Sequence, residues 1–386
     1  DKSEENNMKL SLEGIKNSSD WKVADIALPG YDVEKASRKA QEAPRWVHFG
    51  IGNIFRIFIG SIADGLLENG ELDTALTCVE TFDYDVVDKI YRPFDNLGLS
   101  VVLNTDGTRD YKVLGAFGEA VKAQSTDPEQ WNRLKEIFVS PSLQLVSFTI
   151  TEKGYALTNA EGKYLPYVQA DIDHGPDRAT GAMAIVTSML LERYKKGGTP
   201  LALVSMDNCS QNGSLLRSSV LTMTEEWLKR GYVDQGFADY VENEDKVSFP
   251  WTMIDKITPR PNPVIAADLK ALGVEDMEPV ETSKRTYIAP FVNGEDPQYL
   301  VIEDHFPNGR PALEKGKGVY LGSRDTVNKS ERMKVTALLN PVHSAVAPLG
   351  VLLGEEYFAT LINHDPKLMK LAKMVAYDEG MPMVPD

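Results

Sequence analysis

Strand-like and helix-like segments alternate along most of this chain, and this pattern constrains the fold more than any other feature. Short apolar runs that end in glycine or polar residues are typical of buried strands, and longer amphipathic runs are typical of helices. The strand-like runs are 45–52, 76–83, 143–151 and 201–208, and the helix-like runs are 54–70, 131–140, 178–198 and 214–231. Such alternation predicts a mostly parallel sheet with helices on both of its faces.

Two further regions depart from this alternation. Residues 99–105 and 111–117 flank Asp106 and Gly107, a pair typical of a hairpin turn, and they predict two antiparallel strands. Residues 299–306 predict a late strand, and the pattern is helical from residue 325 onward.

The charge and the cysteines limit the partners and the compartment. The net charge of −16, from 41 basic and 57 acidic side chains, disfavours nucleic acid and anionic membranes as partners. A small anionic substrate stays compatible, because a local group of Arg and Lys can override the global sign. No run of about 18 apolar residues occurs, so no membrane-spanning helix is expected. Two separate cysteines, Cys78 and Cys209, favour a reduced, cytoplasmic protein.

The first strand leads into the sequence HFGIGNIFR at 48–56, which resembles a dinucleotide-binding turn. Two glycines permit a tight turn and a close approach of a pyrophosphate, and the following helix offers free N–H groups and a positive dipole end. The match is incomplete because Phe55 stands where a third glycine is usual. The candidate cofactor-binding residues here are Gly50, Gly52, Asn53, Ile54, Phe55 and Arg56.

Glu80 ends the next predicted strand and supplies a second indication of the same ligand. A carboxylate at this place binds the ribose hydroxyls of an adenosine and repels a 2′-phosphate, so the pattern predicts NAD instead of NADP as the cofactor. The alternative is a glycine turn in an α/β fold that holds no ligand.

Near the end of the chain, residues 331–350 place Lys334, Asn340 and His343 in an otherwise apolar, helix-like run. Such groups are costly to bury without partners. A partly desolvated Lys can act as a general base near neutral pH. The alternative is a helix whose Lys reaches solvent and whose Asn and His bond to the backbone.

Other polar residues follow the predicted strands, where ligands of open parallel sheets gather. Glu152 follows the strand at 143–151, and both Asn208 and Asn212 follow the strand at 201–208. Asp255 lies within FPWTMIDKITPRP, residues 249–261. Taken singly, each of these is also explained by ordinary turn composition.

No metal site is expected. None of the histidines forms an i, i+4 pair, and neither CxxC nor HExxH spacing occurs. A dehydrogenase built on this chain would therefore need a side-chain base instead of zinc.

Taken together, these motifs resemble the polyol-specific long-chain dehydrogenases, which include mannitol 2-dehydrogenase and fructuronate reductase, a D-mannonate oxidoreductase. The motifs are HFGIGNIFR, TEKGY (151–155), the DN and NG of 207–213, FPWTMIDKITP, VIEDHF and MKVTALLNPVHS. The resemblance spans residues 45–386 and implies an α/β fold with a Rossmann-type, mostly parallel domain and a mainly helical C-terminal domain. We accordingly expect an irregular N-terminal segment at 1–44, the Rossmann-type domain at 45–325, and the incomplete start of the helical domain at 326–386.

The resemblance also implies roles for the candidate residues. Lys334 corresponds to the general base of the family, and Asn340 and His343 to its hydrogen-bond partners at the reacting oxygen. Asn208 corresponds to the asparagine that completes this group, although Asn212 is close enough to be confused with it.

Two carboxylates complete the implied site. Glu152 corresponds to the acid of the TEKGY segment near the base, and Asp255 would line the nicotinamide side. The implied enzyme is NAD-dependent and zinc-independent, and it acts on a small carbohydrate as a monomer or small homo-oligomer. The expected reaction interconverts D-fructuronate and D-mannonate, with mannitol and fructose, or a non-catalytic NAD(H) sensor, as alternatives.

One spacing departs from the family pattern, in which the Lys and Asn are usually five residues apart. Here Lys334 and Asn340 are six apart, and Lys334 and His343 are nine apart. Nine residues of regular helix would place the two side chains about 180° apart. Since Pro341 lacks an N–H, and an extra residue can be absorbed by a π-bulge, we predict an i→i+5 irregularity or kink between Lys334 and Pro341.

Overall fold

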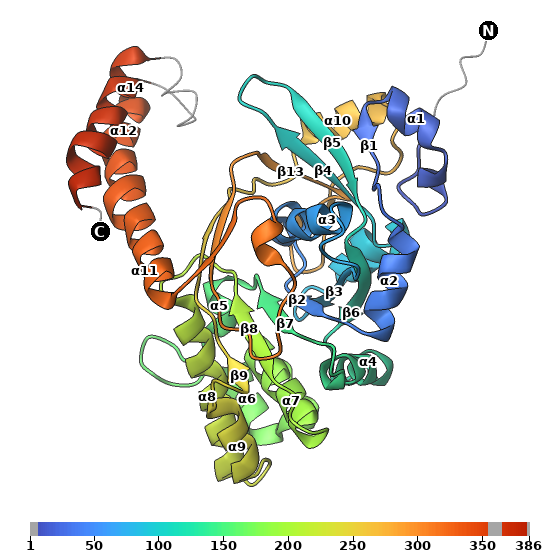
Figure 1. Cartoon of the computed structure of the whole chain (residues 1–386), viewed down its shortest axis with the longest axis vertical. Coiled ribbons are helices and arrows are strands. Elements are labelled where there is room, and N and C mark those ends of the chain that lie inside the picture. Colours follow the sequence, from blue (N-terminus) through green and yellow to red (C-terminus); the bar gives the residue numbers. More distant parts are fainter. Residues whose placement is uncertain (1–6, 354–364, 384–386) are drawn as a thin grey trace.

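A six-stranded sheet forms the centre of the molecule (Figure 1), whose computed structural model describes residues 7–353 and 365–383. The strands in spatial order are β6 (Phe117–Lys122), β3 (Leu76–Glu80), β2 (Trp46–Phe49), β7 (Leu145–Phe148), β8 (Leu201–Ser205) and β9 (Val247–Ser248). All neighbouring pairs are parallel. In chain order this is 3-2-1-4-5-6, the arrangement of two mononucleotide-binding halves, and it confirms the predicted parallel sheet.

Both faces of this sheet are buried, because successive side chains of each strand belong to different hydrophobic clusters. In β8, Ala202 and Val204 pack into one cluster, and Leu201 and Leu203 pack into the other. Full burial of a side chain such as Leu203 stabilises the fold by about 1.5–3 kcal/mol. The first face is covered by α2 (Val33–Glu42), η2 (Phe55–Ile59) and α3 (Gly60–Glu68), and the second by α4 (Pro128–Val139), α7 (Ala182–Lys195) and α8 (Asn212–Lys229).

The N-terminal segment, expected to be irregular, is ordered over residues 7–43. It contains α1 (Ser18–Val23), β1 (Ile26–Ala27) and α2. Asp32 caps α2 by accepting from the N–H of Lys35, an interaction that typically contributes about 1 kcal/mol. The expectation was wrong because the apolar residues of α2, which include Val33 and Ala36, are small and widely separated by charged ones.

Smaller sheets lie beside the central one. The predicted antiparallel hairpin is confirmed by β4 (Gly98–Leu103) and β5 (Arg109–Leu114), which join β1 and β13 (Phe291–Glu295) in a four-stranded sheet. A three-stranded sheet contains β10 (Thr252–Asp255), β14 (Tyr299–Glu303) and β15 (Val319–Gly322). A short hairpin consists of β11 (Val280–Glu281) and β12 (Tyr287–Ile288). The remaining α-helices before residue 324 are α5 (Thr151–Tyr155), α6 (Pro166–His174), α9 (Gln235–Glu242) and α10 (Pro263–Ala271).

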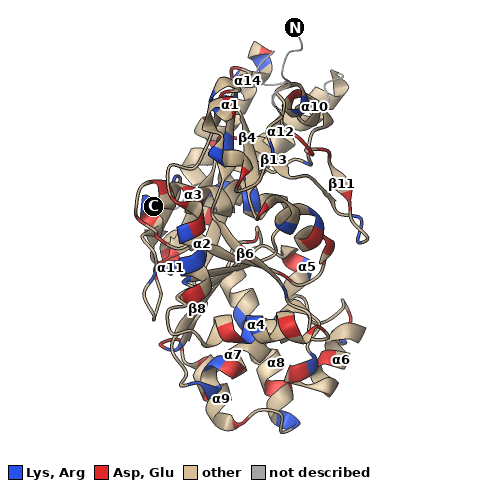
Figure 2. Cartoon of the chain, turned by 90° about the vertical axis from the view of Figure 1, so that its right-hand side faces the viewer, with Lys and Arg blue, Asp and Glu red and all other residues tan. Residues whose placement is uncertain are grey.

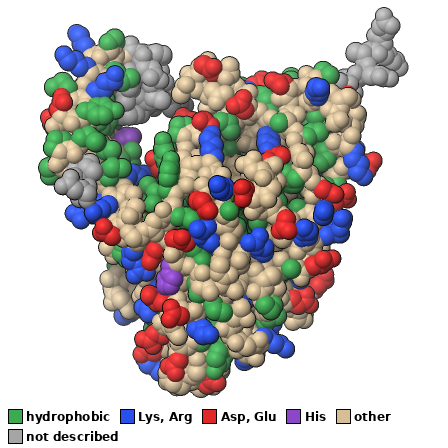
Figure 3. Space-filling view, viewed as in Figure 1, with side chains coloured by type: hydrophobic (Ala, Val, Ile, Leu, Met, Phe, Trp, Pro, Cys, Tyr) green, Lys and Arg blue, Asp and Glu red, His purple; other side chains and the backbone are tan. Residues whose placement is uncertain are grey.

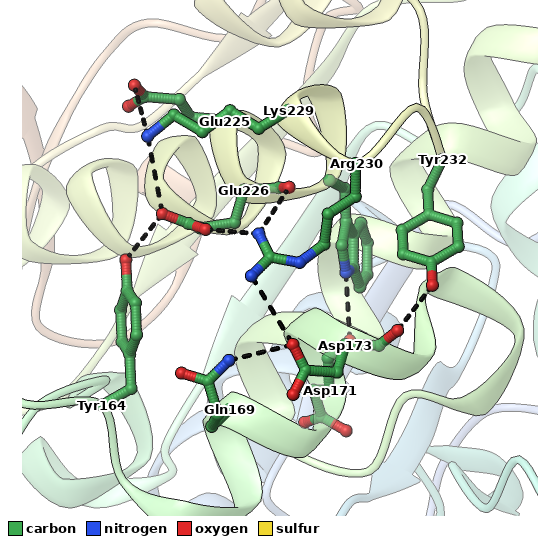
Figure 4. A network of polar contacts seen from close by, with 10 residues as sticks. Tyr164, Gln169, Asp171, Asp173, Glu225, Glu226, Lys229, Arg230 and Tyr232 are labelled. Carbon is green, nitrogen blue, oxygen red and sulfur yellow. Dashed lines mark hydrogen bonds and ion pairs between the residues drawn. The ribbon is translucent and has the colours of Figure 1, made fainter.

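A polar network joins α6 to the end of α8 (Figure 4). Arg230 forms ion pairs with Glu226 at 2.6 Å and with Asp173 at 3.5 Å. Tyr232 donates its hydroxyl to the carbonyl of Asp173, and Tyr164 donates to Glu226. These contacts fix the two helices to each other on the surface of the domain.

The C-terminal part is a helical arm (residues 324–353 and 365–383) that stands beside the body (Figure 1). Its long helix consists of α11 (Arg324–Arg332), the π-helix η7 (Met333–Leu339) and α12 (Asn340–Leu352), against which α14 (Pro366–Lys373) and η8 (Met374–Gly380) pack. A hollow separates the upper arm from the body, and apolar side chains remain at the arm surface (Figure 3). Among the described residues, the long helix at 324–352 is apolar and long enough to cross a membrane by length and composition alone, and 17% of its most apolar stretch is buried.

Candidate active site

The glycine turn after β2 lies at the centre of the parallel sheet, where the chain order of the strands reverses. Gly50 has φ +89°, and a side chain there would place its Cβ 2.0 Å from the carbonyl oxygen of Thr149. A Cβ on Gly52 would meet no atom within 4 Å, so the backbone is open on that side. The helix begins at Asn53 and directs its first N–H groups into this space. Such a turn fits a pyrophosphate.

A chain of hydrogen bonds supports the turn from below. The His48 ring is completely buried between the hydroxyls of Ser147 and Thr149. Because Thr149 donates its own proton to the Gly50 carbonyl at 2.8 Å, it accepts from His48 Nε2. His48 Nδ1 then accepts from Ser147, which in turn accepts from the Trp46 indole N–H. Every member is satisfied with a neutral imidazole, and burial lowers the pKa of His48 to about 3.

Phe55 stacks on this histidine, with the two ring centroids 4.2 Å apart. The residue that replaces the usual third glycine therefore packs the helix against β2. Arg56 is buried as well, and its guanidinium donates to the carbonyls of Ala289 and Pro290, each at 2.7 Å. These contacts indicate that Phe55 and Arg56 hold the domain together beneath the turn.

Glu80 is only 8% exposed and binds the backbone around the turn. Its Oε2 accepts from the N–H of Ile51 at 3.3 Å, and its Oε1 accepts from three successive N–H groups, those of Thr81, Phe82 and Asp83. Burial raises the pKa of the Glu80 carboxyl. Both oxygens of the Glu80 carboxylate thus help to fix the glycine turn to the end of β3. The sequence predicts a carboxylate that faces the ribose, and these backbone contacts are an additional role.

Lys334 lies on the long helix of the arm and reaches back to the body. Its side chain is 11% exposed, and its Nζ donates to the carbonyl of Ile254 at 2.6 Å and lies 3.6 Å from Asp255 Oδ1. Both partners belong to β10. The candidate base is therefore held in a partly desolvated position beside a carboxylate, and not on the outer face of the helix.

The predicted helical irregularity is confirmed. Residues Met333–Leu339 form a π-helix, and the N–H of Asn340 bonds to the carbonyl of Val335, five residues earlier. When one residue is absorbed in this way, the side chains of Lys334 and His343 are separated by about 80° around the helix axis instead of about 180°. His343 and Asn340 are both exposed, and His343 Nδ1 lies 2.9 Å from the carbonyl of Leu339.

The two asparagines after β8 have different environments. Asn212 is 1% exposed; its Nδ2 donates to the carbonyls of Ser205 and Asp207, and its Oδ1 accepts from the N–H of Thr252. The amide of Asn212 is thus occupied in joining β8 to β10, the strand that binds Lys334. Asn208 is exposed, as is Glu152 in α5, the short helix that follows β7.

Asp207 joins the ends of β7 and β8, a role that the sequence did not reveal. Its carboxylate accepts from the N–H groups of Ile150 and Thr151, both at 3.0 Å, and from the Tyr155 hydroxyl at 2.6 Å. Thr151 has φ +62°, an uncommon conformation for a β-branched residue, and two successive N–H groups in such a turn form an anion-binding nest. Burial raises the pKa of Asp207. The tyrosine of TEKGY was the available signal for this contact.

Two polar contacts seat the arm next to these strand ends. Arg324 pairs with Glu303 at 3.0 Å, and the same carboxylate accepts from the N–H of Trp251. Glu331 accepts from the N–H of Gln211, whose φ of +50° marks the tight turn before α8. The helix that carries Lys334 is therefore attached to both β14 and the turn after β8. Among the residues that the structure describes, no group of three or more His, Cys, Asp or Glu side chains is placed to hold a metal ion.

The family described as the mannitol dehydrogenase Rossmann domain matches residues 44–315. The chain belongs to the mannitol dehydrogenase family. It is 47% identical over 380 residues to D-mannonate oxidoreductase of Thermotoga maritima. The aligned region covers 98% of this chain and 70% of that protein. The chain spans 63% of the length of several other relatives.

Two solved structures share the fold of this chain. D-sorbitol dehydrogenase in substrate-free form has a TM-score of 0.78 at 28% identity. The superposed region covers 94% of this chain and 69% of the sorbitol dehydrogenase chain. Mannitol 2-dehydrogenase of Pseudomonas fluorescens, in complex with NAD and D-mannitol, has a TM-score of 0.75 at 25% identity. The superposed region covers 98% of this chain and 70% of the mannitol dehydrogenase chain. The expected Rossmann-type domain followed by a helical part is thereby confirmed.

Proposed function

We propose that this oxidoreductase interconverts D-fructuronate and D-mannonate with NAD as the hydride carrier. The observation that carries the proposal is the position of Lys334, which the π-helix and β10 hold beside Asp255 and close to the strand ends of a dinucleotide-binding sheet. The choice of substrate is supported by the 47% identity to a D-mannonate oxidoreductase over almost the whole chain.

The glycine turn supplies the site for the cofactor. Gly50, Gly52 and the first N–H groups of the helix at Asn53 would hold the pyrophosphate, and the open space at Gly52 fits this assignment. Bound NAD would accept hydride from the substrate carbon in the oxidative direction.

The remaining chemistry belongs to side chains. Lys334 takes the proton from the substrate hydroxyl during oxidation and returns it to the carbonyl oxygen during reduction. The amides of Asn208 and Asn340 donate hydrogen bonds to this oxygen, where each positioned donor is worth about 3 kcal/mol in the transition state. Asp255 orients the amine, and Glu152 relays the proton toward solvent.

The proposal is tested by following the absorbance of NADH with fructuronate and then with fructose. We expect turnover with fructuronate, and we expect Lys334→Ala to lower kcat/KM by about 10²–10⁴-fold, the usual contribution of a positioned base. Lys229→Ala, on the exposed surface of α8 (Figure 4), is the matched control and should retain full activity.

Three other results would contradict the proposal in different ways. Faster turnover of fructose would favour mannitol and fructose as the substrates, an alternative supported by the structural likeness to a mannitol 2-dehydrogenase. Binding of NADH without turnover of either sugar would favour a nucleotide sensor. Full activity of the Lys334→Ala variant would remove the lysine from the mechanism.

We also propose a cytoplasmic location, in keeping with two free cysteines.

A further inference from the structure

We propose that the β11–β12 hairpin forms the adenosine end of the nucleotide site, and that Lys284 at its tip allows this site to accept a 2′-phosphate. This inference rests on the proposed nucleotide-binding function and concerns how the same site selects between NAD(H) and NADP(H). The hairpin protrudes from the body, with basic residues at its tip (Figure 2).

The hairpin borders the nucleotide site along its length. At its base, the carbonyl of Tyr287 accepts from the Asn53 side chain, at the start of the helix that faces the pyrophosphate. At its tip, the Thr282 hydroxyl donates to Asp83 at 2.6 Å, and the N–H of Ser283 donates to Asp85 at 2.8 Å. A segment about 200 residues later in the chain is therefore attached to the loop that follows β3.

The tip places a cation beside an exposed aromatic ring. Phe82 is 64% exposed, and the Nζ of Lys284 lies 4.9 Å from its ring centroid. Phe82 is only two residues past Glu80, at the strand end where Rossmann-type sheets bind the adenosine ribose. An exposed ring here offers a surface on which an adenine can stack, and a neighbouring cation offers a partner for a phosphate.

Three acidic groups at and after the end of β3 are already engaged. Glu80 is buried against four backbone N–H groups, Asp83 is 4% exposed and bonded to Thr282, and Asp85 is paired with Lys89 at 3.7 Å. Lys284 and Arg285 are exposed, and within residues 7–353 and 365–383 neither of them forms an ion pair. The repulsion that a free Glu80 carboxylate would exert on a 2′-phosphate is thus reduced, and positive charge faces the same place.

The inference is tested by titrating the chain with NADH and with NADPH and following the fluorescence of the bound nucleotide, which requires no turnover. We expect the two Kd values of the unmodified chain to lie within about tenfold of each other. Lys284→Ala should weaken NADPH binding by about tenfold and NADH binding by less than about twofold, and added salt should reduce the difference. Phe82→Ala should weaken both nucleotides by about tenfold, because both contain the adenine.

Lys270→Ala, another exposed lysine, on α10, is the control and should change neither Kd. The inference is overturned if NADH binds but NADPH binds more than about 100-fold more weakly, or if Lys284→Ala affects both nucleotides equally. It is also overturned if Phe82→Ala leaves both affinities unchanged. Failure of the unmodified chain to bind either nucleotide would instead overturn the proposed function itself.

Discussion

At the point where the sheet reverses its strand order, His48 lies fully buried between two hydroxyl groups and under the ring of Phe55. The directions of the hydrogen bonds leave room for one proton on the ring, at Nε2. A second proton would have to be placed on Nδ1, opposite the Ser147 oxygen, whose own proton points toward the ring. Protonation therefore requires the local network to break.

This network predicts how stability depends on pH. The pKa of His48 is about 3 in the folded protein and 6.5 in the unfolded chain, so the unfolded chain binds more protons between these values. The stabilisation that comes from keeping His48 neutral is fully present above pH 6.5, and it is lost as the pH falls toward 3. At pH 5 the loss amounts to about 2 kcal/mol.

The measurement is urea unfolding at pH 7 and pH 5, with His48→Gln compared to the unmodified chain. The variant is expected to be less stable at pH 7. Its free energy of unfolding should fall by about 2 kcal/mol less than that of the unmodified chain between pH 7 and pH 5. His174→Gln, at an exposed position, should leave the pH dependence as it is. An unchanged pH dependence in His48→Gln would show that this imidazole is protonated in the folded state.

Single residues were predictable from the sequence where their backbone decided their role. Gly50 was found because a left-handed φ next to a strand end suits glycine, and the structure has φ +89° there. The hydrogen-bond partners of Glu80 and Asp207 were not predictable, because a carboxylate reveals nothing in the sequence about which N–H groups will surround it. Their donors come from turns whose geometry depends on neighbouring strands.

At the scale of elements, the ends of β7 and β8 are one unit because Asp207 binds both. It holds Thr151 in a left-handed conformation that costs of order 1–3 kcal/mol by itself. The turn that presents Glu152 therefore depends on a carboxylate from the next strand of the sheet.

Asp207→Asn tests this unit. Because the amide has one oxygen in place of two, it cannot accept from both Ile150 and Thr151 and also from Tyr155. We expect the free energy of unfolding to fall by about 1–3 kcal/mol and hydrogen exchange to rise at residues 151–155. Tyr155→Phe removes only one of the three bonds and should lose about 1 kcal/mol without the increase in exchange at Thr151. Equal exchange in the unmodified chain and in Asp207→Asn would show that the turn is stable by itself.

Long, regular elements were predictable, and short ones were not. Strands such as β7 were recognised by their continuous apolar runs, and the π-helix by the extra residue between Lys334 and Asn340. Strands β11 and β12 have two residues each, which is too short for any periodicity. Their position over the end of β3 follows from packing between segments far apart in the chain, which the sequence pattern does not record.

At the scale of the whole molecule, the body and the arm differ in how they are stabilised. The body contains two large clusters of fully buried side chains, one on each face of the sheet. Within the described part of the arm, the buried side chains of its hydrophobic cluster are Val346, Leu368 and Ala372. Several large apolar residues of the arm, such as Leu352 at 81%, are exposed.

The arm is therefore expected to open locally at a lower free energy than the body, because local stability follows buried apolar contact. Its attachment to the body includes the polar contacts of Arg324 with Glu303, of Glu331 with Gln211, and of Lys334 with Ile254 and Asp255. Hydrogen exchange measured by mass spectrometry should show slow exchange in β2, β7 and β8 and faster exchange across 324–352. Arg324→Ala should increase exchange at 324–332 further and leave β2 unchanged, whereas Arg230→Ala, in the network of Figure 4, should not affect the arm. If 324–352 exchanged as slowly as β2, the exposed apolar side chains of the arm would have to be covered in solution, most simply by a second copy of this chain, and the exchange rate would then depend on protein concentration.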